Sequence, residues 1–184
     1  MDNNYIKETS IKGLFVIDRP IFEDDRGFFR EVFRLKDLEE SIGFKFNIVQ
    51  SNHAHSKPNV IRALHAENWN KLVYPINGKM FAAVVDIREE SDTFGKSETF
   101  NFDSNFRKAL FIPKGLANSI CVNGEDTVDY IYYVDSYYDG SDTSAIAWDD
   151  PTLNINWPVK NPIISDRDRN NHTLKETFPN KFKK

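Results

Sequence analysis

The sequence predicts an all-β domain, built as a sandwich or a closed barrel, with few helices. Short apolar runs recur along the 184-residue chain and are separated by clusters of Asp, Asn, Gly and Pro, which is typical of these folds. In the run Thr127–Val134, every second residue from Val128 is Val or Tyr, so these side chains share one face of a strand. The length fits a single domain, residues 1–184, that can bury its own core.

The N-terminal part is expected to hold two strands and the one convincing helix. Leu14–Ile17 and Phe28–Phe33 are apolar or aromatic runs, and the turn-forming cluster "EDDRG" lies between them. Leu35–Ser41 is predicted to be helical, and Gly43 follows as its C-cap because glycine readily adopts positive φ. Phe46–Gln50 is the next expected strand.

The central part is expected to be rich in strands. Lys71–Ile76 leads to Asn77–Gly78, the strongest short-range hairpin signal, and Met80–Arg88 follows as a buried strand. Two further strands are expected at Lys108–Ile112 and Ser119–Val122. From Asp139 the chain is rich in Asp, Asn and Pro, so we expect loop and a short helix wrapped on the barrel.

Composition excludes several classes of protein. The formal charge is −4, and no dense Lys/Arg block precedes the short tail "KFKK", so nucleic acid is not an expected partner. The single cysteine, Cys121, excludes a disulfide scaffold and favours a reducing compartment. The polar start "MDNNYIKETS" lacks the apolar core of a signal peptide, and the apolar runs are too short to span a membrane. We therefore expect a cytoplasmic protein without a membrane partner.

The stretch "IRALHAENWNK" places ionisable side chains beside the most apolar part of the chain. His65 suits proton abstraction near neutral pH, Arg62 suits phosphate, and Lys71 suits a developing oxyanion. The plainer interpretations are a histidine at the rim of the core and solvated charges at strand ends. Arg62 and His65 are three positions apart, and residues an odd number of positions apart point to opposite faces of a strand. Both can therefore face one way only if the strand bends between them.

A metal centre is the main alternative for this stretch. His53, His55, His65 and Glu67 supply imidazole and carboxylate ligands, and H-x-H on a strand aims both rings the same way. However, the stretch "PKGLANS" at Pro113–Ser119 resembles metal-binding members of the cupin superfamily, which have a histidine ligand where this chain has Asn118. Asn is a poor ligand for a transition metal. We therefore predict no metal.

Other polar and aromatic residues have more than one interpretation each. Five of the seven tyrosines fall within residues 130–138; they can pack on strands, donate protons or stack on a flat base. Arg26, beside Gly27, can bind phosphate or lie in solvent, and Gln50 and Asn52 can pair with a base edge or cap strands.

The chain has no P-loop, G-x-G-x-x-G, G-x-S-x-G or C-x-x-C motif, so nucleotide redox chemistry on a Rossmann domain is unsupported.

Ordered motifs along nearly the whole chain resemble the dTDP-4-dehydrorhamnose 3,5-epimerase family. They are "FEDDRGFF", "VQSNH", "IRALH", "KLVYPINGKMFAAVVDIREESDTFG", "FIPKGLA", "YIYYVDSYY", "WDDPTLNINWP" and "PIISDRD". The resemblance implies a cupin-like β-barrel (jelly roll) that forms a homodimer, with N-terminal strands available for exchange, and that uses no metal or redox cofactor. It also implies a nucleotide-linked 4-keto-6-deoxy sugar as substrate, carried by dTDP, GDP or CDP, in deoxysugar biosynthesis of the O-antigen or capsule type.

The resemblance also assigns roles to individual residues. His65 matches the base that removes a proton next to the keto group, and Asp168 matches the carboxylate that orients it. Tyr132 matches the acid on the opposite face of the sugar, and Lys71 matches the lysine near the enolate oxygen. Contacts to the sugar or nucleotide are implied for Arg26, Glu31, Gln50, Asn52, Arg62, Asn118 and Tyr138.

This chain departs from the family pattern around the expected site. Ala63 replaces a usual Gly, Ala66–Glu67 replaces an aromatic–Gln pair, and Asn118 replaces a second pocket histidine. The loop from His65 to Lys71 is also shorter. These departures leave open the sugar, the nucleotide, and whether C3, C5 or both are inverted. Two other enzyme classes also stay open: a 3,4-ketoisomerase of the same superfamily and a metal-dependent cupin.

Overall fold

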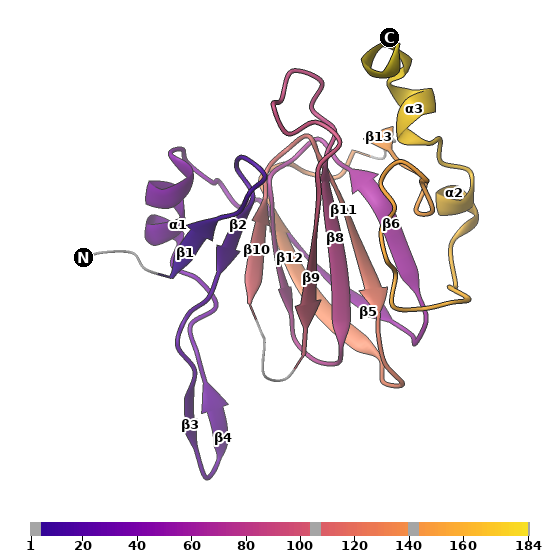
Figure 1. The fold of residues 1–184 in the computed structure, drawn as a ribbon. Coiled ribbons are helices and arrows are strands. Elements are labelled where there is room, and N and C mark those ends of the chain that lie inside the picture. Colours follow the sequence, from indigo (N-terminus) through magenta and orange to yellow (C-terminus); the bar gives the residue numbers. More distant parts are fainter. Residues whose placement is uncertain (1–4, 104–107, 140–143, 184) are drawn as a thin grey trace.

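The computed structural model describes residues 5–103, 108–139 and 144–183. Two antiparallel sheets face each other, and a separate two-stranded hairpin projects from the body (Figure 1). The predicted all-β, cupin-like barrel with short peripheral helices is confirmed. No helix among the described residues is long and apolar enough to cross a membrane.

The larger sheet has six strands. Their order across the sheet is β1 (Ile6–Glu8), β2 (Phe15–Ile17), β10 (Ala109–Ile112), β7 (Lys71–Pro75), β12 (Val128–Val134) and β5 (Gln50–Ser56). The facing sheet has the order β13 (Ser144–Ala145), β6 (Ile61–Ala66), β11 (Leu116–Val122), β8 (Met80–Asp86) and β9 (Ser97–Phe102). The projecting hairpin pairs β3 (Phe22–Asp24) with β4 (Gly27–Phe29).

Strand β8 explains why its sequence is a continuous apolar run. Its alternate residues Met80, Ala82 and Val84 belong to the core between the two sheets. The residues between them belong to a second core on the outer face of the same sheet. A strand that is buried on both faces shows no alternation of apolar and polar residues, and every residue of β8 is buried.

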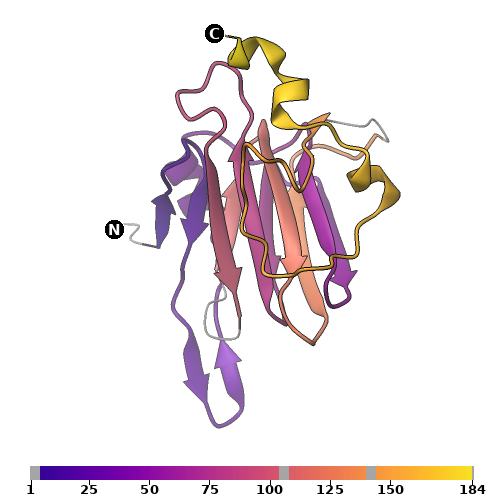
Figure 2. The ribbon, with the colours of Figure 1, turned by 45° about the vertical axis from the view of Figure 1, so that its right-hand side comes forward.

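The C-terminal segment covers that outer face. It runs across the smaller sheet in Figure 2 and carries α2 (Asp166–Arg169), α3 (Leu174–Thr177) and the 3₁₀ turn Pro179–Phe182. Ile146, Leu153 and Leu174 pack on the sheet there. Where the structure describes it, the segment from Asp139 is mostly loop with short helices, and it packs on the smaller sheet.

The helix α1 (Leu35–Ile42) covers the outer face of the larger sheet, where Leu38 and Phe46 pack on Leu72 and Phe111. It ends where predicted, because Gly43 adopts φ of 82° and its N–H donates to Glu39 O. The strand predicted at Phe46–Gln50 was wrong. Phe46 is buried in the outer core beside α1, and strand β5 begins at Gln50 instead.

Three other expectations are corrected. The run Phe28–Phe33 is a strand only up to Phe29. Asn77–Gly78 is a turn, but β7 and β8 on its two sides belong to different sheets and do not pair, so the expected hairpin is a crossover between sheets. Strands β5 and β9 were not predicted. Their outward residues are polar and their inward residues include both polar and apolar side chains, so neither strand shows a clear alternation of apolar and polar residues.

Candidate active site

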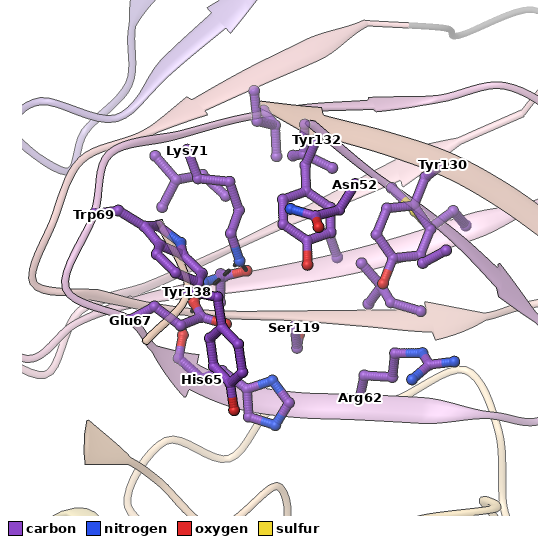
Figure 3. A pocket seen from close by; sticks show the side chains of 18 of the residues that line it. Asn52, Arg62, His65, Glu67, Trp69, Lys71, Ser119, Tyr130, Tyr132 and Tyr138 are labelled. Carbon is purple, nitrogen blue, oxygen red and sulfur yellow. Dashed lines mark hydrogen bonds and ion pairs between the residues drawn. The ribbon is translucent and has the colours of Figure 1, made fainter. Parts of the chain in front are cut away.

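A cavity of about 330 Å³ lies between the two sheets (Figure 3). Strands β5, β7, β10 and β12 of the larger sheet supply one wall, and β6, β8 and β11 of the smaller sheet supply the other. The cavity gathers most of the side chains that the sequence singled out: Gln50, Asn52, Arg62, His65, Lys71, Asn118, Tyr132 and Tyr138.

His65 and Asp168 form the closest pair of the site. His65 Nε2 lies 2.6 Å from Asp168 Oδ1. Asp168 sits in the first turn of α2, where its N–H donates to the Ser165 hydroxyl, the N-cap of the helix. Burial raises the pKa of Asp168, but the hydrogen bond and charge of His65, together with hydrogen bonds involving the Ala63 N–H and Ser165, outweigh burial and lower the pKa. The carboxylate therefore stays ionised and can hold the imidazole ring in one orientation.

A bulge in β6 resolves the odd spacing of Arg62 and His65. Asn118 pairs with His65 and Ile120 pairs with Arg62, so β6 holds one more residue than β11 in this interval. The consecutive residues Ala63 and Leu64 both pack in the outer core. As a result, Arg62 and His65 both line the cavity although three positions separate them.

Tyr132 and Lys71 lie on the wall opposite His65. Tyr130 and Tyr132 alternate along β12 and stack with ring centroids 6.2 Å apart. The ammonium of Lys71 lies 5.0 Å from the centroid of the Tyr132 ring, a cation–π contact. Burial, followed by the negative charge of Glu67, raises the pKa of Tyr132. The phenol is therefore a protonated group that faces the cavity.

Glu67 was considered only as a metal ligand, and the structure gives it other partners. Lys71 Nζ lies 3.0 Å from Glu67 Oε2 and 3.0 Å from Asn118 Oδ1. The Asn118 amide donates to the His65 carbonyl oxygen at 2.7 Å. Two of the residues that depart from the family pattern, Glu67 and Asn118, thus both contact Lys71.

Aromatic and amide side chains surround another part of the cavity. The rings of Trp69 and Tyr138 meet edge to face with centroids 6.3 Å apart, and Gln50 Oε1 accepts the Tyr138 N–H. Within the described part of the chain, the buried Asn52 Nδ2 and Trp69 Nε1 have no hydrogen-bond partner. Buried donors are normally paired, so both are available to a bound molecule.

Two residues of the cavity were missed from the sequence. Trp69 is the only large apolar residue in the polar loop after β6, which was a usable signal. Arg167 also lines the cavity, and its position next to Asp168 in "SDRD" was the available clue. With Arg62, it brings a second guanidinium to the cavity wall.

The structure does not bring Arg26 and Glu31 to this cavity. Arg26 lies in the turn between β3 and β4 and pairs with Asp24. Glu31 pairs with Arg19 at 2.7 Å and with Arg34 at 3.0 Å. Neither residue lines the cavity of its own chain.

The histidines of the metal hypothesis do not converge. His53 and His55 do aim the same way, but toward Asp129 on the exposed face of the larger sheet, at 2.8 and 3.0 Å. His65 faces the cavity instead. Among the described residues, no group of three or more His, Cys, Asp or Glu side chains is arranged to hold a metal ion.

Comparison with known proteins gives concordant matches over nearly the whole chain. Residues 8–176 match the family model described as dTDP-4-dehydrorhamnose 3,5-epimerase. A relative of that name from Shigella flexneri is 39% identical over 171 residues, which cover 91% of this chain and 93% of the relative.

Solved structures of epimerases are also similar to this chain. NovW, a 4-keto-6-deoxy sugar epimerase from the novobiocin biosynthetic gene cluster of Streptomyces spheroides, is similar with a TM-score of 0.90 at 27% identity, covering 96% of this chain and 90% of NovW. ChmJ, a 3'-monoepimerase from Streptomyces bikiniensis in complex with dTDP-quinovose, is similar with a TM-score of 0.85 at 29% identity, covering 93% of this chain and 89% of ChmJ.

Proposed function

Because the chain belongs to the dTDP-4-dehydrorhamnose 3,5-epimerase family, we propose that it inverts C3, C5 or both in a nucleotide-linked 4-keto-6-deoxy sugar. The observation that carries this proposal is the placement of His65 and Tyr132. They come from different sheets, β6 and β12, and line the same cavity from facing walls. An imidazole and a phenol on opposite sides of one ring are what inversion by proton exchange requires.

The chemistry follows from the carbonyl at C4. It acidifies the C–H bonds at C3 and C5, because the resulting carbanion delocalises to an enolate. His65 accepts the proton as a neutral base oriented by Asp168, and Tyr132 delivers a proton to the other face of the ring. The Lys71 ammonium, beside the Tyr132 ring, stabilises the negative oxygen of the enolate.

The wall around Trp69 and Tyr138 supports binding of the nucleotide. Paired aromatic rings suit a flat base, and the guanidinium groups of Arg62 and Arg167 suit the diphosphate. We propose dTDP as the nucleotide, because ChmJ holds a dTDP sugar. Thermal shifts with dTDP, GDP, CDP and UDP test this choice, since the true nucleotide raises the melting temperature most.

We also propose a homodimer in which the β3–β4 hairpin of one protomer reaches the cavity of its partner. The hairpin projects from its own barrel (Figure 1) and exposes Phe22, Phe28 and Phe29 by 63, 50 and 69%. Large exposed aromatic side chains on a protruding hairpin mark an interaction surface. Such an exchange would deliver Arg26 and Glu31 to a site that neither reaches in its own chain. We also propose a cytoplasmic location, because nucleotide sugars are made in the cytoplasm.

Solvent exchange tests the reaction. The protein is incubated in D₂O with a 4-keto-6-deoxyglucose linked to dTDP, GDP or CDP, and NMR follows C3 and C5. The expected result is deuterium at one or both carbons with inverted configuration. A product whose carbonyl has moved to C3 would instead identify a 3,4-ketoisomerase. No exchange with any of the nucleotides would contradict the proposed function.

A further inference from the structure

The ion pair of Glu67 with Lys71 is part of the proposed site, yet the reaction outlined above gives Glu67 no role. The side chains of Glu67 and Lys71 are exposed by only 19 and 10%. They are four positions apart in the chain, and their charged atoms lie 3.0 Å apart. In Figure 3 the pair lies on the cavity wall near Trp69 and Tyr138.

The position of the Lys71 ammonium is defined from three sides. It donates to Glu67 Oε2 and to Asn118 Oδ1, each at 3.0 Å, and it lies over the Tyr132 ring. An ammonium has three N–H donors. Within the residues that the structure describes, two of the three have acceptors, which leaves one for an oxygen atom in the cavity.

The carboxylate of Glu67 is ionised in this position. Burial raises its pKa, but the charge of Lys71 and their hydrogen bond outweigh burial, and the net pKa is lowered. The negative charge of Glu67 in turn contributes to the raised pKa of Tyr132, after burial, while Arg62 opposes it. The other titratable side chains that line the cavity are His65, Lys71, Tyr130, Tyr138 and Arg167.

We propose that Glu67 is a positioning residue: it is the counter-ion that holds the Lys71 ammonium against the Tyr132 ring, with Asn118 as the second acceptor. This inference rests on the proposed epimerase chemistry and deepens it. A buried ammonium without a counter-ion is costly. Loss of the Glu67 charge therefore releases the Lys71 ammonium from its place and removes a negative charge that raises the pKa of Tyr132. The phenol then loses its proton at lower pH, and that proton is needed for turnover.

Three variants separate the charge of Glu67 from its reach. Glu67→Gln keeps the shape and removes the charge, Glu67→Asp keeps the charge and shortens the side chain, and Glu67→Ala removes both. Glu90→Gln removes an exposed carboxylate and serves as the matched control. The measurements are kcat and KM across pH, with melting temperatures to confirm folding.

In Glu67→Gln, the alkaline limb of the kcat profile is expected to move to lower pH by about one unit, because the negative charge that opposes ionisation of the Tyr132 phenol is lost. In Glu67→Ala, kcat at neutral pH is expected to fall roughly 10- to 100-fold with little change in KM, because Lys71 is no longer held in place. Glu67→Asp is expected to restore the alkaline limb. The Glu90→Gln profile should match the wild type.

If Glu67→Gln and Glu67→Ala show the wild-type kcat and alkaline limb, the inference is overturned while the epimerase function stands. A second measurement needs no substrate. NMR of the Lys71 ammonium, assigned by its loss in Lys71→Arg, is expected to show protected N–H protons in the wild type that Glu67→Ala loses. Protected protons that persist in Glu67→Ala overturn the inference even if the wild type proves to be inactive as an epimerase.

Discussion

His65 Nε2 and Asp168 Oδ1 lie 2.6 Å apart although 103 positions separate the two residues in the chain. One residue belongs to a strand of the smaller sheet and the other to a short helix of the segment that covers this sheet. An ionised carboxylate only accepts hydrogen bonds, so Nε2 carries a proton, and in the neutral ring the lone pair is then on Nδ1. The contact thus fixes the tautomer in which Nδ1 can act as the base.

Removal of the base should stop exchange at the sugar ring. His65→Asn is expected to lower the rate of deuterium incorporation by roughly 10²- to 10⁴-fold, the usual contribution of a positioned base. Asp168→Asn should cause a smaller loss, because the base remains but its orientation does not. NMR in D₂O measures both rates, and unchanged melting temperatures exclude unfolding. Normal exchange in His65→Asn would mean that another group is the base.

Tyr132→Phe should separate proton removal from inversion. His65 still removes protons in this variant, but no acid returns one from the opposite wall. We expect deuterium to enter with retained configuration, and inverted product to form roughly 10²-fold more slowly. Tyr133→Phe is the matched control, because Tyr133 faces the outer core and not the cavity. An unchanged rate of inversion in Tyr132→Phe would remove this tyrosine from the mechanism.

The exchanged hairpin can be tested by complementation. Arg26→Ala and His65→Asn should each be inactive alone, and mixing them under conditions that reshuffle subunits should restore part of the activity. In the mixed dimer, one site combines His65 of the Arg26→Ala protomer with an intact hairpin from the other protomer. Mixtures that stay inactive, although mass spectrometry shows mixed dimers, would place the hairpin of each protomer in its own site or outside any site.

Trp69 is expected to act in nucleotide binding. Trp69→Ala removes the ring that packs against Tyr138, and loss of a stacking ring costs about 1–3 kcal/mol per base. KM should therefore rise roughly tenfold or more while kcat changes little. Trp69→Phe is the control: it retains an aromatic ring and should behave nearly as the wild type. Trp148→Ala would not serve as a control, because Trp148 packs in the outer core. A fall in kcat without a rise in KM would contradict the assignment.

Acid stability should depend on Asp86, away from the site. Asp86 is fully buried and accepts hydrogen bonds from Arg88, Ser91 and Thr93. Burial raises the pKa of Asp86, but these bonds outweigh it and lower the pKa to about 2. The unfolded chain, with an ordinary pKa of about 3.9, binds the proton first as pH falls. The contribution to stability, about 2 kcal/mol, is therefore present above pH ~4 and is lost toward pH ~2.

Urea unfolding between pH 5 and pH 2 measures this effect. Asp86→Asn should be less stable at pH 5 and should show a flatter dependence of the unfolding free energy on pH. The exposed Asp126→Asn variant should keep the wild-type slope. Equal slopes in the wild type and Asp86→Asn would show that the Asp86 network does not stabilise the fold through ionisation.

Features that depend on nearby residues could be predicted from the sequence. The helix Leu35–Ile42 ends at Gly43 because a glycine is at the position that needs positive φ. The alternation in β12 placed Tyr130 and Tyr132 on one face, because successive side chains of a strand point to opposite sides. The ordered motifs identified the family, and with it His65, Tyr132 and Asp168 as candidate site residues. In the structure, His65 and Tyr132 line one cavity, and Asp168 contacts His65.

Features that depend on sheet pairing were decided only by the tertiary structure. The bulge in β6, which aims Arg62 and His65 into one cavity, arises from the register with β11. The crossover at Asn77–Gly78 occurs because β7 and β8 find partners elsewhere in the chain. The meeting of Glu67 and Asn118 on Lys71 likewise joins separate elements. Local patterns encode which face of a strand is buried, but they carry no information about the strand on the other side.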